Sequence, residues 1–217
     1  MTKHTNWRSR VQYPAPTSTM QLARSSATLA GAAVALMLFG VTSALAVSVL
    51  LPPGAILPTP STTAATEPDL SGVVIHDKLV PFTIKAPNGP VLCAGNLQDR
   101  VVRSTTTGLF HFYYRIRDTH GPGAVSRIAT ASFGMLALQV AYRTDGLGTV
   151  PPRIASRSIA PGALVTFELT DPSVSCAQHQ ESRFILIKTT VKAFHAGGVT
   201  RIFATTGAEV PVPTVMP

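Results

Sequence analysis

Hydrophobic and polar residues alternate along much of the chain after residue 52. The segment Leu109–Arg117 shows this best. One side of its alternation carries Phe110, Phe112, Tyr114 and Ile116, and the other carries His111, Tyr113, Arg115 and Arg117. A period of two is typical of a β-strand with one buried face. We therefore expect the first set in a core and the second set on a solvated face.

Further segments read in the same way. Leu164–Leu169 alternates, and Phe184–Ile187 is apolar on both faces, as in a central strand. Other predicted strands are Val73–Ile75, Leu79–Ala86, Gln98–Arg103, Ser126–Phe133, Ala137–Tyr142, Ile154–Ser158 and Val199–Ala204. Turn signals rich in Pro and Gly, such as Pro161-Gly162, separate them. About ten short strands at this spacing, with no helical period after Pro52, predict an antiparallel β-sandwich or jelly roll.

The N-terminal part has a different pattern. Residues 1–26 hold Lys and Arg but no acid, and residues 27–51 are almost continuously apolar. A basic flank before an apolar run stays in the cytoplasm while the run enters the membrane. As a retained anchor, residues 27–51 give roughly 37 Å of helix, enough for a hydrocarbon core of about 30 Å. As a signal peptide, the run ends in a small-residue site with the cut after Ala46.

The start of translation bears on this choice. Starting at Met20 would give a signal peptide of ordinary proportions with a short basic region, and residues 1–19 would then be a misassigned start. The apolar run continues past Ala46, which favours an anchor instead. Under both interpretations the rest of the chain is exported, and it stays membrane-bound only if the N-terminal helix is uncleaved.

The exported part divides into a linker and one domain. Residues 52–68 are rich in Pro, Thr and Ser, which favours an extended spacer. Residues 69–217 are long enough to bury a core and form the predicted β-sandwich domain. The two cysteines of the chain, Cys93 and Cys176, both lie there, and an even count in an exported chain predicts one disulfide. Two separate buried thiols are the alternative.

Motifs for chemistry are missing from the sequence. The chain has no G-x-S-x-G, H-E-x-x-H, phosphate-binding loop, dinucleotide fingerprint or calcium loop. Asp118-Thr119-His120-Gly121 resembles a protease acid and histidine, but it reads better as a polar turn between strands. We therefore predict no catalytic residue, no metal site and no cofactor.

Charge offers a weaker clue to function. The chain has 18 Lys and Arg against 10 Asp and Glu, a net charge of +8, although only 13% of its residues are charged. On the predicted solvated face, His111, Tyr113 and Arg115 form a basic and aromatic group. Arg matches carboxylate and phosphate groups, so these residues are the candidate ligand site for an envelope glycan, a lipid headgroup or a surface protein. Export and the absence of a reading motif exclude nucleic acid as a partner.

The order of several strand sequences resembles uncharacterised exported bacterial β-sandwich proteins of the kind that often carry a PEP-CTERM sorting tail. The matching pieces are Gly72-Val73-Val74, Val80-Pro81-Phe82, Arg100–Arg103, Thr107–Tyr114, Glu181–Phe184 and Ile187-Lys188-Thr189. The resemblance implies a cell-surface or matrix setting and supplies no catalytic residue. The sequence ends after Val210-Pro211-Val212-Pro213 without an apolar tail or Arg cluster, so we expect any attachment at the N-terminus.

The sequence thus predicts an exported, envelope-associated β-sandwich with a non-catalytic binding or structural role. The alternative is a hydrolase or lyase that acts on envelope polysaccharide, with its site on the loops around Asp118–His120 and Asp145. An enzyme requires titratable groups that converge in a cleft with perturbed pKa values. A binding module requires a shallow face instead.

Overall fold

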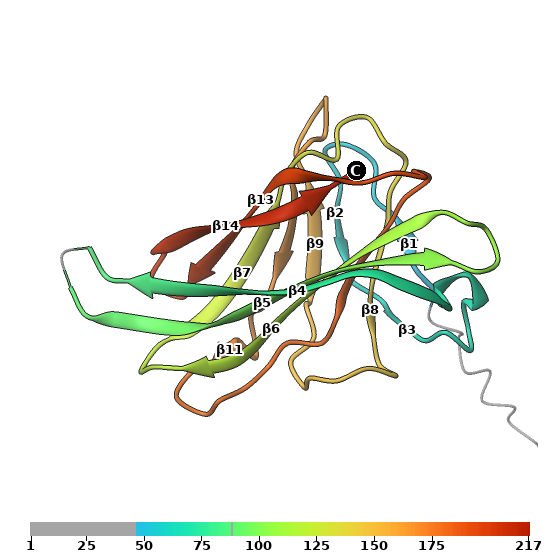
Figure 1. The fold of residues 1–217 in the computed structure, drawn as a ribbon. Coiled ribbons are helices and arrows are strands. Elements are labelled where there is room, and N and C mark those ends of the chain that lie inside the picture. Colours follow the sequence, from blue (N-terminus) through green and yellow to red (C-terminus); the bar gives the residue numbers. More distant parts are fainter. Residues whose placement is uncertain (1–46, 88) are drawn as a thin grey trace, which may run out of the picture. The chain divides into compact units, whose positions relative to one another are not determined.

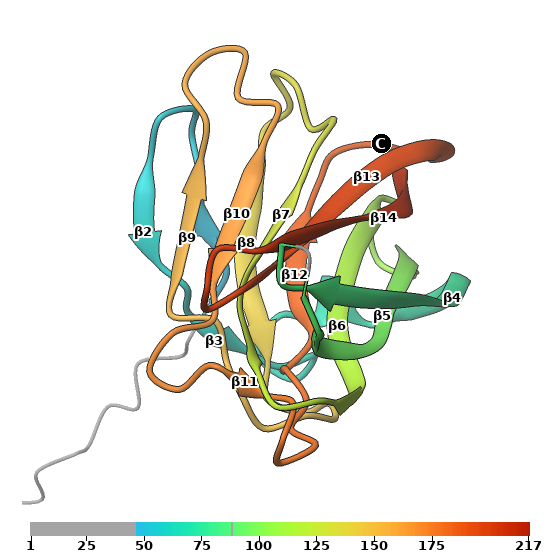
Figure 2. The same ribbon diagram turned by 90° about the vertical axis from the view of Figure 1, so that its left-hand side faces the viewer.

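The computed structural model describes residues 47–87 and 89–217, and in this part of the chain the fold is all-β. Two seven-stranded sheets face each other (Figure 1 and Figure 2). The one helical element described is a 3-10 turn, η1 (Pro68–Leu70). The fold is consistent with the sandwich that the alternating pattern predicts. No helix within the described residues has the length and apolarity to cross a membrane.

Sheet A contains the strand with the clearest alternation. Its order is β1 (Val49–Leu50), β8 (Gln139–Arg143), β12 (Ile185–Lys188), β6 (Phe110–His120), β5 (Val91–Ser104) and β4 (Gly72–Lys85), with β3 (Ser61–Thr62) paired to β8. The β3–β8 pair is parallel and the other pairs of the sheet are antiparallel. The strand β12 lies between β8 and β6, which confirms the central position expected of its apolar sequence.

Sheet B closes the other side of the core. Its order is β14 (Glu209–Met216), β13 (His195–Ala204), β7 (Ala124–Thr130), β10 (Val165–Glu168), β9 (Ile154–Arg157) and β2 (Ile56–Pro58), with β11 (Val174–Ser175) paired to β7. The pattern does not predict β14, because Pro211 and Pro213 interrupt it. Both prolines lie in β14, an edge strand whose open side has no neighbouring strand in the sheet. On that side no ladder hydrogen bond needs the N–H group that each proline lacks.

The core lies between the sheets and contains the residues expected there. Phe112, Tyr114 and Ile116 of β6 are fully buried against residues of sheet B such as Ile128 and Phe167. The Thr130 hydroxyl donates a hydrogen bond of 3.3 Å to the Tyr114 hydroxyl, which is therefore partnered inside the core. Burial raises the pKa of Tyr114, and it therefore stays protonated.

The expectation for the opposite face of β6 is wrong. His111, Tyr113 and Arg115 are only 1%, 3% and 3% exposed. A second apolar cluster covers this outer side of sheet A, and Tyr113 belongs to it. The other members are Leu70, Val102, Ala141, Phe184 and Leu186. Period-two alternation places these side chains on the outer face, but it does not show that another segment covers that face.

The cover of this face includes Leu70 of η1, which lies just after residues 52–68, the segment for which the sequence predicts a linker. The segment contributes β2 and β3 to the two sheets, and Leu51 before it is fully buried. Val49 and Leu50, the end of the predicted membrane segment 27–51, pair with β8. Residues 27–46 of that segment, which include the cleavage residue Ala46, and the basic flank 1–26 lie outside the described residues.

The disulfide expected from the cysteine count is present. Cys93 of β5 and Cys176 after β11 are bonded, with Cα atoms 5.7 Å apart, and both are fully buried. The bond joins sheet A to the loop that follows β11 of sheet B. It closes a loop with a sequence separation of 83.

Breaking this disulfide should lower the free energy of unfolding by roughly 4–5 kcal/mol, because the unfolded chain regains loop entropy. We expect Cys93→Ser and the double variant Cys93→Ser/Cys176→Ser to lose the same amount in urea unfolding. Wild-type protein that unfolds at the same urea concentration with and without reductant would contradict this expectation.

Candidate functional site

One row of side chains crosses the outer face of sheet A. In the ladder, Leu50 of β1 pairs with Gln139 of β8, Gln139 pairs with Lys188 of β12, and Lys188 pairs with His111 of β6. Residues paired in this way point to the same side of a sheet. Four adjacent strands therefore present two polar side chains, one cation and one aliphatic side chain in a line.

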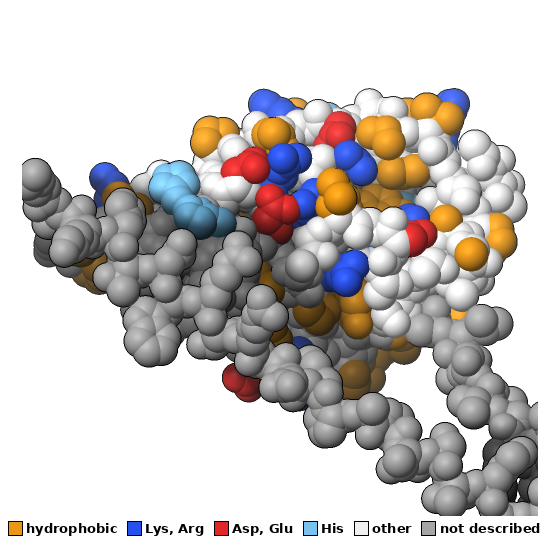
Figure 3. All heavy atoms as spheres, turned by 90° about the horizontal axis from the view of Figure 1, so that it is seen from below, with side chains coloured by type: hydrophobic (Ala, Val, Ile, Leu, Met, Phe, Trp, Pro, Cys, Tyr) orange, Lys and Arg blue, Asp and Glu red, His pale blue; other side chains and the backbone are white. Residues whose placement is uncertain are grey.

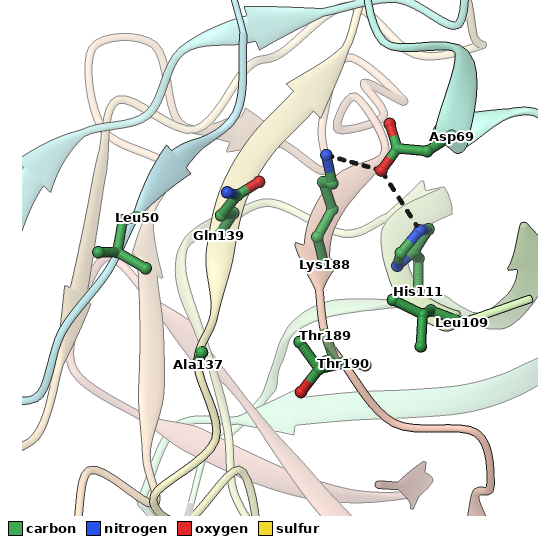
Figure 4. Close-up of a pocket in the computed structure, with 9 residues that line it drawn as sticks. All are labelled: Leu50, Asp69, Leu109, His111, Ala137, Gln139, Lys188, Thr189 and Thr190. Atoms are coloured by element: carbon green, nitrogen blue, oxygen red, sulfur yellow. Dashed lines mark ion pairs between the residues drawn. The ribbon is translucent and has the colours of Figure 1, made fainter. Parts of the chain in front are cut away.

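A hollow of about 260 Å³ opens over this row, and we call it the first hollow (Figure 4). Asp69, Thr189 and Thr190 join the three polar side chains of the row in its lining. Leu109 and Ala137 join Leu50 as apolar walls. In Figure 4 the side chains of Asp69, Lys188 and His111 point toward one another at one side of the hollow. The site thus combines aliphatic walls with a small polar group.

Two carboxylates hold the cation of this site. The Lys188 ammonium lies 2.5 Å from a carboxylate oxygen of Glu67 and 2.9 Å from one of Asp69. Glu67 is 4% exposed and also accepts hydrogen bonds from Thr62 and Ser48. Burial alone raises the pKa of Glu67, but the hydrogen bonds from Lys188, Thr62 and Ser48 outweigh it and hold that pKa below its usual value.

His111 is the buried polar side chain of the hollow without a hydrogen bond. Both of its ring nitrogens are buried, and within the part of the chain that the structure describes neither forms a hydrogen bond of normal distance and angle. The backbone groups of Phe110 and Asp69 nevertheless lie near enough to raise the pKa of the imidazole. The nearest carboxylate oxygen, from Asp69, lies 3.9 Å from Nε2. Burial lowers the pKa of His111, and Lys188 lowers it further against the opposing effect of Asp69. The imidazole is therefore neutral at pH 7, with one donor and one acceptor nitrogen.

Tyr113 and Arg115 line two further hollows along the same strand. The second hollow, about 180 Å³, includes Tyr113, Arg143 and Phe184. The third, about 390 Å³, includes Arg115 and Glu181. Burial raises the pKa of Tyr113 to about 12, so its hydroxyl is neutral. The three candidate residues thus lie on one face of β6, but each belongs to a different hollow.

The basic character expected of this face is neutralised by ion pairs. Carboxylates lie opposite the guanidinium groups: Asp77 against Arg100 at 2.6 Å, Asp145 against Arg143 at 2.6 Å, and Glu181 against Arg115. Figure 3 shows acidic and basic side chains close together, with hydrophobic side chains between them. The guanidinium groups of Arg100 and Arg115 also lie 4.8 and 5.5 Å from the Phe184 ring centre. Among the described residues of this face, these charges are paired and do not gather into a patch of one sign.

The loops proposed for an enzyme carry acids with lowered pKa values. At Asp118, hydrogen bonds from Asn96 and Arg117 outweigh the effect of burial and lower the pKa. At Asp145, the Arg143 hydrogen bonds are the main cause of a lowered pKa. A general acid requires a raised pKa instead. His120 is exposed beside Asp118, and its Nδ1 lies 3.5 Å from the backbone oxygen of Asp118.

Asp99 is a buried acid whose pKa is raised, unlike those of Asp118 and Asp145. It is 1% exposed, accepts a hydrogen bond from the Val215 backbone, and lies 3.4 Å from His76. Burial is the largest effect and raises its pKa, although the Val215 and His76 contacts lower it. The alternation of β5 places Asp99 on the core side with Leu97 and Val101. This acid is enclosed in the sandwich and lines none of the three hollows.

The sequence interpretation missed most of the first hollow. It identified His111, but Glu67 and Asp69 fall in or beside the segment interpreted as a linker, and Lys188 ends a strand that reads as core. Within residues 47–87 and 89–217, no group of three or more His, Cys, Asp or Glu side chains is arranged to hold a metal ion. The β6–β12 register places Lys188 beside His111, but Glu67 and Asp69 belong to neither strand, so the alternation gives no signal for their pairing with Lys188.

Comparison with known proteins adds no relative. No protein-family model, no curated protein and no solved structure matches the chain.

The ion pair between Glu67 and Lys188 should stabilise the domain in a pH-dependent way. Glu67→Gln leaves a buried ammonium less well compensated, and we expect a loss of about 3 kcal/mol in the free energy of unfolding at pH 7. The pKa of Glu67 is lowered on folding, so its stabilisation is complete above the unfolded value of about 4.3 and is lost as the pH falls below it.

Urea unfolding between acidic and neutral pH measures this effect. The difference between wild type and Glu67→Gln should shrink as the pH falls below about 4. The control is Glu67→Gln/Lys188→Met, which removes both charges and should cost less than the sum of the two single changes. A difference that is constant over the whole pH range would exclude the ion pair as its cause.

Proposed function

We propose that the protein is an exported, non-catalytic binding module that holds one sugar unit of an envelope glycan in the first hollow. The observation that carries this proposal is the buried, neutral imidazole of His111 at the wall of that hollow, with both nitrogens unpartnered within the described residues. An unpartnered buried polar group costs about 1–3 kcal/mol. Both nitrogens are shielded from solvent, so a ligand hydroxyl would recover part of that cost by moving the side chains that separate His111 from the hollow.

The chemistry of the lining supports a neutral, hydroxyl-rich ligand. Asp69 and Gln139 can accept hydrogen bonds from hydroxyl groups, and Gln139 and Thr190 can donate them. Leu50 and Leu109 can pack against the C–H groups of a sugar ring. The volume of about 260 Å³ lies below the roughly 300–1,000 Å³ of pockets for drug-sized ligands, which favours a single ring or a chain end.

The charges of the site argue against an anionic ligand. Lys188 is already paired with Glu67 and Asp69, so the neighbourhood of His111 carries two carboxylates against one ammonium. A phosphate or carboxylate would have to compete with both acids for this cation. The lowered pKa of Glu67 also gives no support to a general acid, which favours binding over the hydrolase or lyase.

Export is supported by the N-terminal pattern and by the disulfide. Residues 1–26 and 27–51 have the charge and hydropathy of an export signal, and disulfides persist mainly in oxidising compartments. The participation of Val49 and Leu50 in β1 favours a cut before these residues over a membrane helix that runs through residue 51.

Intact-mass analysis and fractionation of the native protein test the export proposal. We expect a mass that begins at Val47, two hydrogens lighter than the reduced chain, outside the cytoplasm. Retention inside the cell would contradict export, and a full-length mass in the membrane fraction would contradict cleavage after Ala46.

Calorimetric titration with glycan fragments from a bacterial envelope tests the binding site. His111→Phe keeps an aromatic ring but removes both nitrogens, and Gln139→Leu removes the amide of the neighbouring strand. Each loses about one hydrogen bond, so we expect binding to weaken roughly ten-fold. Thr166→Ala, on the outer face of sheet B, is the matched control. Glycan binding that is unchanged in both hollow variants, or no binding of any fragment, would overturn the proposal.

A further inference from the structure

Three loops meet at one end of the sandwich. They are residues 51–55 between β1 and β2, residues 131–138 between β7 and β8, and residues 158–164 between β9 and β10. Their tips gather at the top of the domain in both ribbon views (Figure 1 and Figure 2). Backbone hydrogen bonds join them pairwise, from Gly54 to Ser158, from Leu51 to Leu138, and from Phe133 to Ala163. We call this end the apex.

The apex carries no charged side chain at its loops and exposes large apolar ones. The three loop sequences are LPPGA, ASFGMLAL and SIAPGAL. Ile159 is 80% exposed and Met135 is 73% exposed, and Ile56 at the start of β2 is 71% exposed. Single exposed apolar residues are ordinary, but a group of them in adjacent uncharged loops marks an interaction surface.

A buried arginine fixes the three loops to one another. Arg157, at the end of β9, is 4% exposed. Its guanidinium donates to the backbone oxygens of Leu51 at 3.0 Å and Gly162 at 2.8 Å, and also to that of Gly134. Each oxygen belongs to a different loop. Charge-assisted hydrogen bonds of this kind are strong, so the exposed tips are held in place before any partner arrives.

Many backbone donors of the apex are already used or absent. Residues 52, 53 and 161 are proline, which has no N–H group. The N–H groups of Ala55 and Gly162 close turns within their own loops, and those of Gly54 and Phe133 bond to neighbouring loops. Unpaired backbone groups prevent entry into hydrocarbon, because no water is present there to satisfy them. The free-energy cost of moving the backbone of the apex from water into a bilayer is therefore smaller than for an ordinary loop.

We propose that the apex inserts Ile159 and Met135 into the surface of a lipid bilayer. The tips project from the end of the domain, and their loops have no charged group to orient a protein partner. A bilayer needs only apolar projections whose backbone is satisfied. Ile159 and Met135 do not line the first hollow, although Ala137, in the same β7–β8 loop as Met135, does. The apex would act in the exported domain without the N-terminal apolar segment.

Tryptophan fluorescence of the full chain tests whether the apex, and not the opposite end of the domain, enters the bilayer. Trp7 is the one tryptophan of the sequence, so Trp7→Phe provides a silent background. In that background Met135→Trp reports on the apex. Leu147→Trp is the matched control, because Leu147 is 67% exposed in the loop between β8 and β9 at the opposite end. The probe is a phosphatidylcholine vesicle with brominated acyl chains, which quench only tryptophan that enters the hydrocarbon.

We expect vesicles to quench the Met135→Trp emission at least about two-fold and to leave the Leu147→Trp emission unchanged. High salt should not alter the result, because charge plays no part at the apex. Adding Ile159→Ser to the Met135→Trp chain should reduce the quenching at residue 135, because the apex loses one buried aliphatic side chain. Quenching and not total vesicle binding is the readout, because the apolar residues 27–51 of the full chain can bind the vesicle in both variants. Equal quenching at both ends, or none at residue 135, would overturn the proposal. Emission that shifts with protein concentration in the absence of vesicles would also overturn it, since a second copy would then occupy the apex.

Discussion

A carboxylate buried at the edge of the sandwich, that of Glu67, can remain charged only if cationic and polar groups surround it. The surrounding groups come from three places in the sequence: Ser48 before β1, Thr62 in β3 and Lys188 at the end of β12. This requirement holds the N-terminal segment against sheet A. The 3-10 turn that follows then places Leu70 over Tyr113 in the outer apolar cluster. Covering the outer face of β6 in this way also forms the first hollow.

The same N-terminal segment connects the two proposed surfaces. Leu50 lines the first hollow, whereas the backbone oxygen of Leu51 binds the arginine that fixes the apex. The last residue of β1 and the first residue of the following loop therefore contribute to a polar site on one face and to an apolar site at one end. In this arrangement the domain could rest on a lipid surface by its loops while the sheet face remains open to a glycan. The two surfaces use different chemistry, one hydrogen bonding and the other apolar burial.

The sequence predicts the strands far better than it predicts the surfaces. Alternation identifies Phe112 and Tyr114 as core because it is a local pattern of the strand. The cysteine count predicts the Cys93–Cys176 bond because two cysteines allow only one pairing. The prolines of residues 52–68 read as a spacer, yet this segment is held by tertiary contacts of Glu67 that no period reveals. For the same reason the sequence does not indicate that His111 is buried. A pairing across β1, β8, β12 and β6 is a property of register, which hydrophobicity alone does not fix here.

Hydrogen exchange of the backbone amides of residues 47–68 tests most directly whether this segment is part of the sandwich. The structure predicts slow exchange at Ser48, Leu51 and Thr59, whose N–H groups bond to Glu67, Leu138 and Arg153. Their protection should approach that of β6, and Glu67→Gln should lower it at Ser48 first. Exchange of these amides at the rate of a free peptide would show that the segment is a linker, and the account of the first hollow would then be wrong.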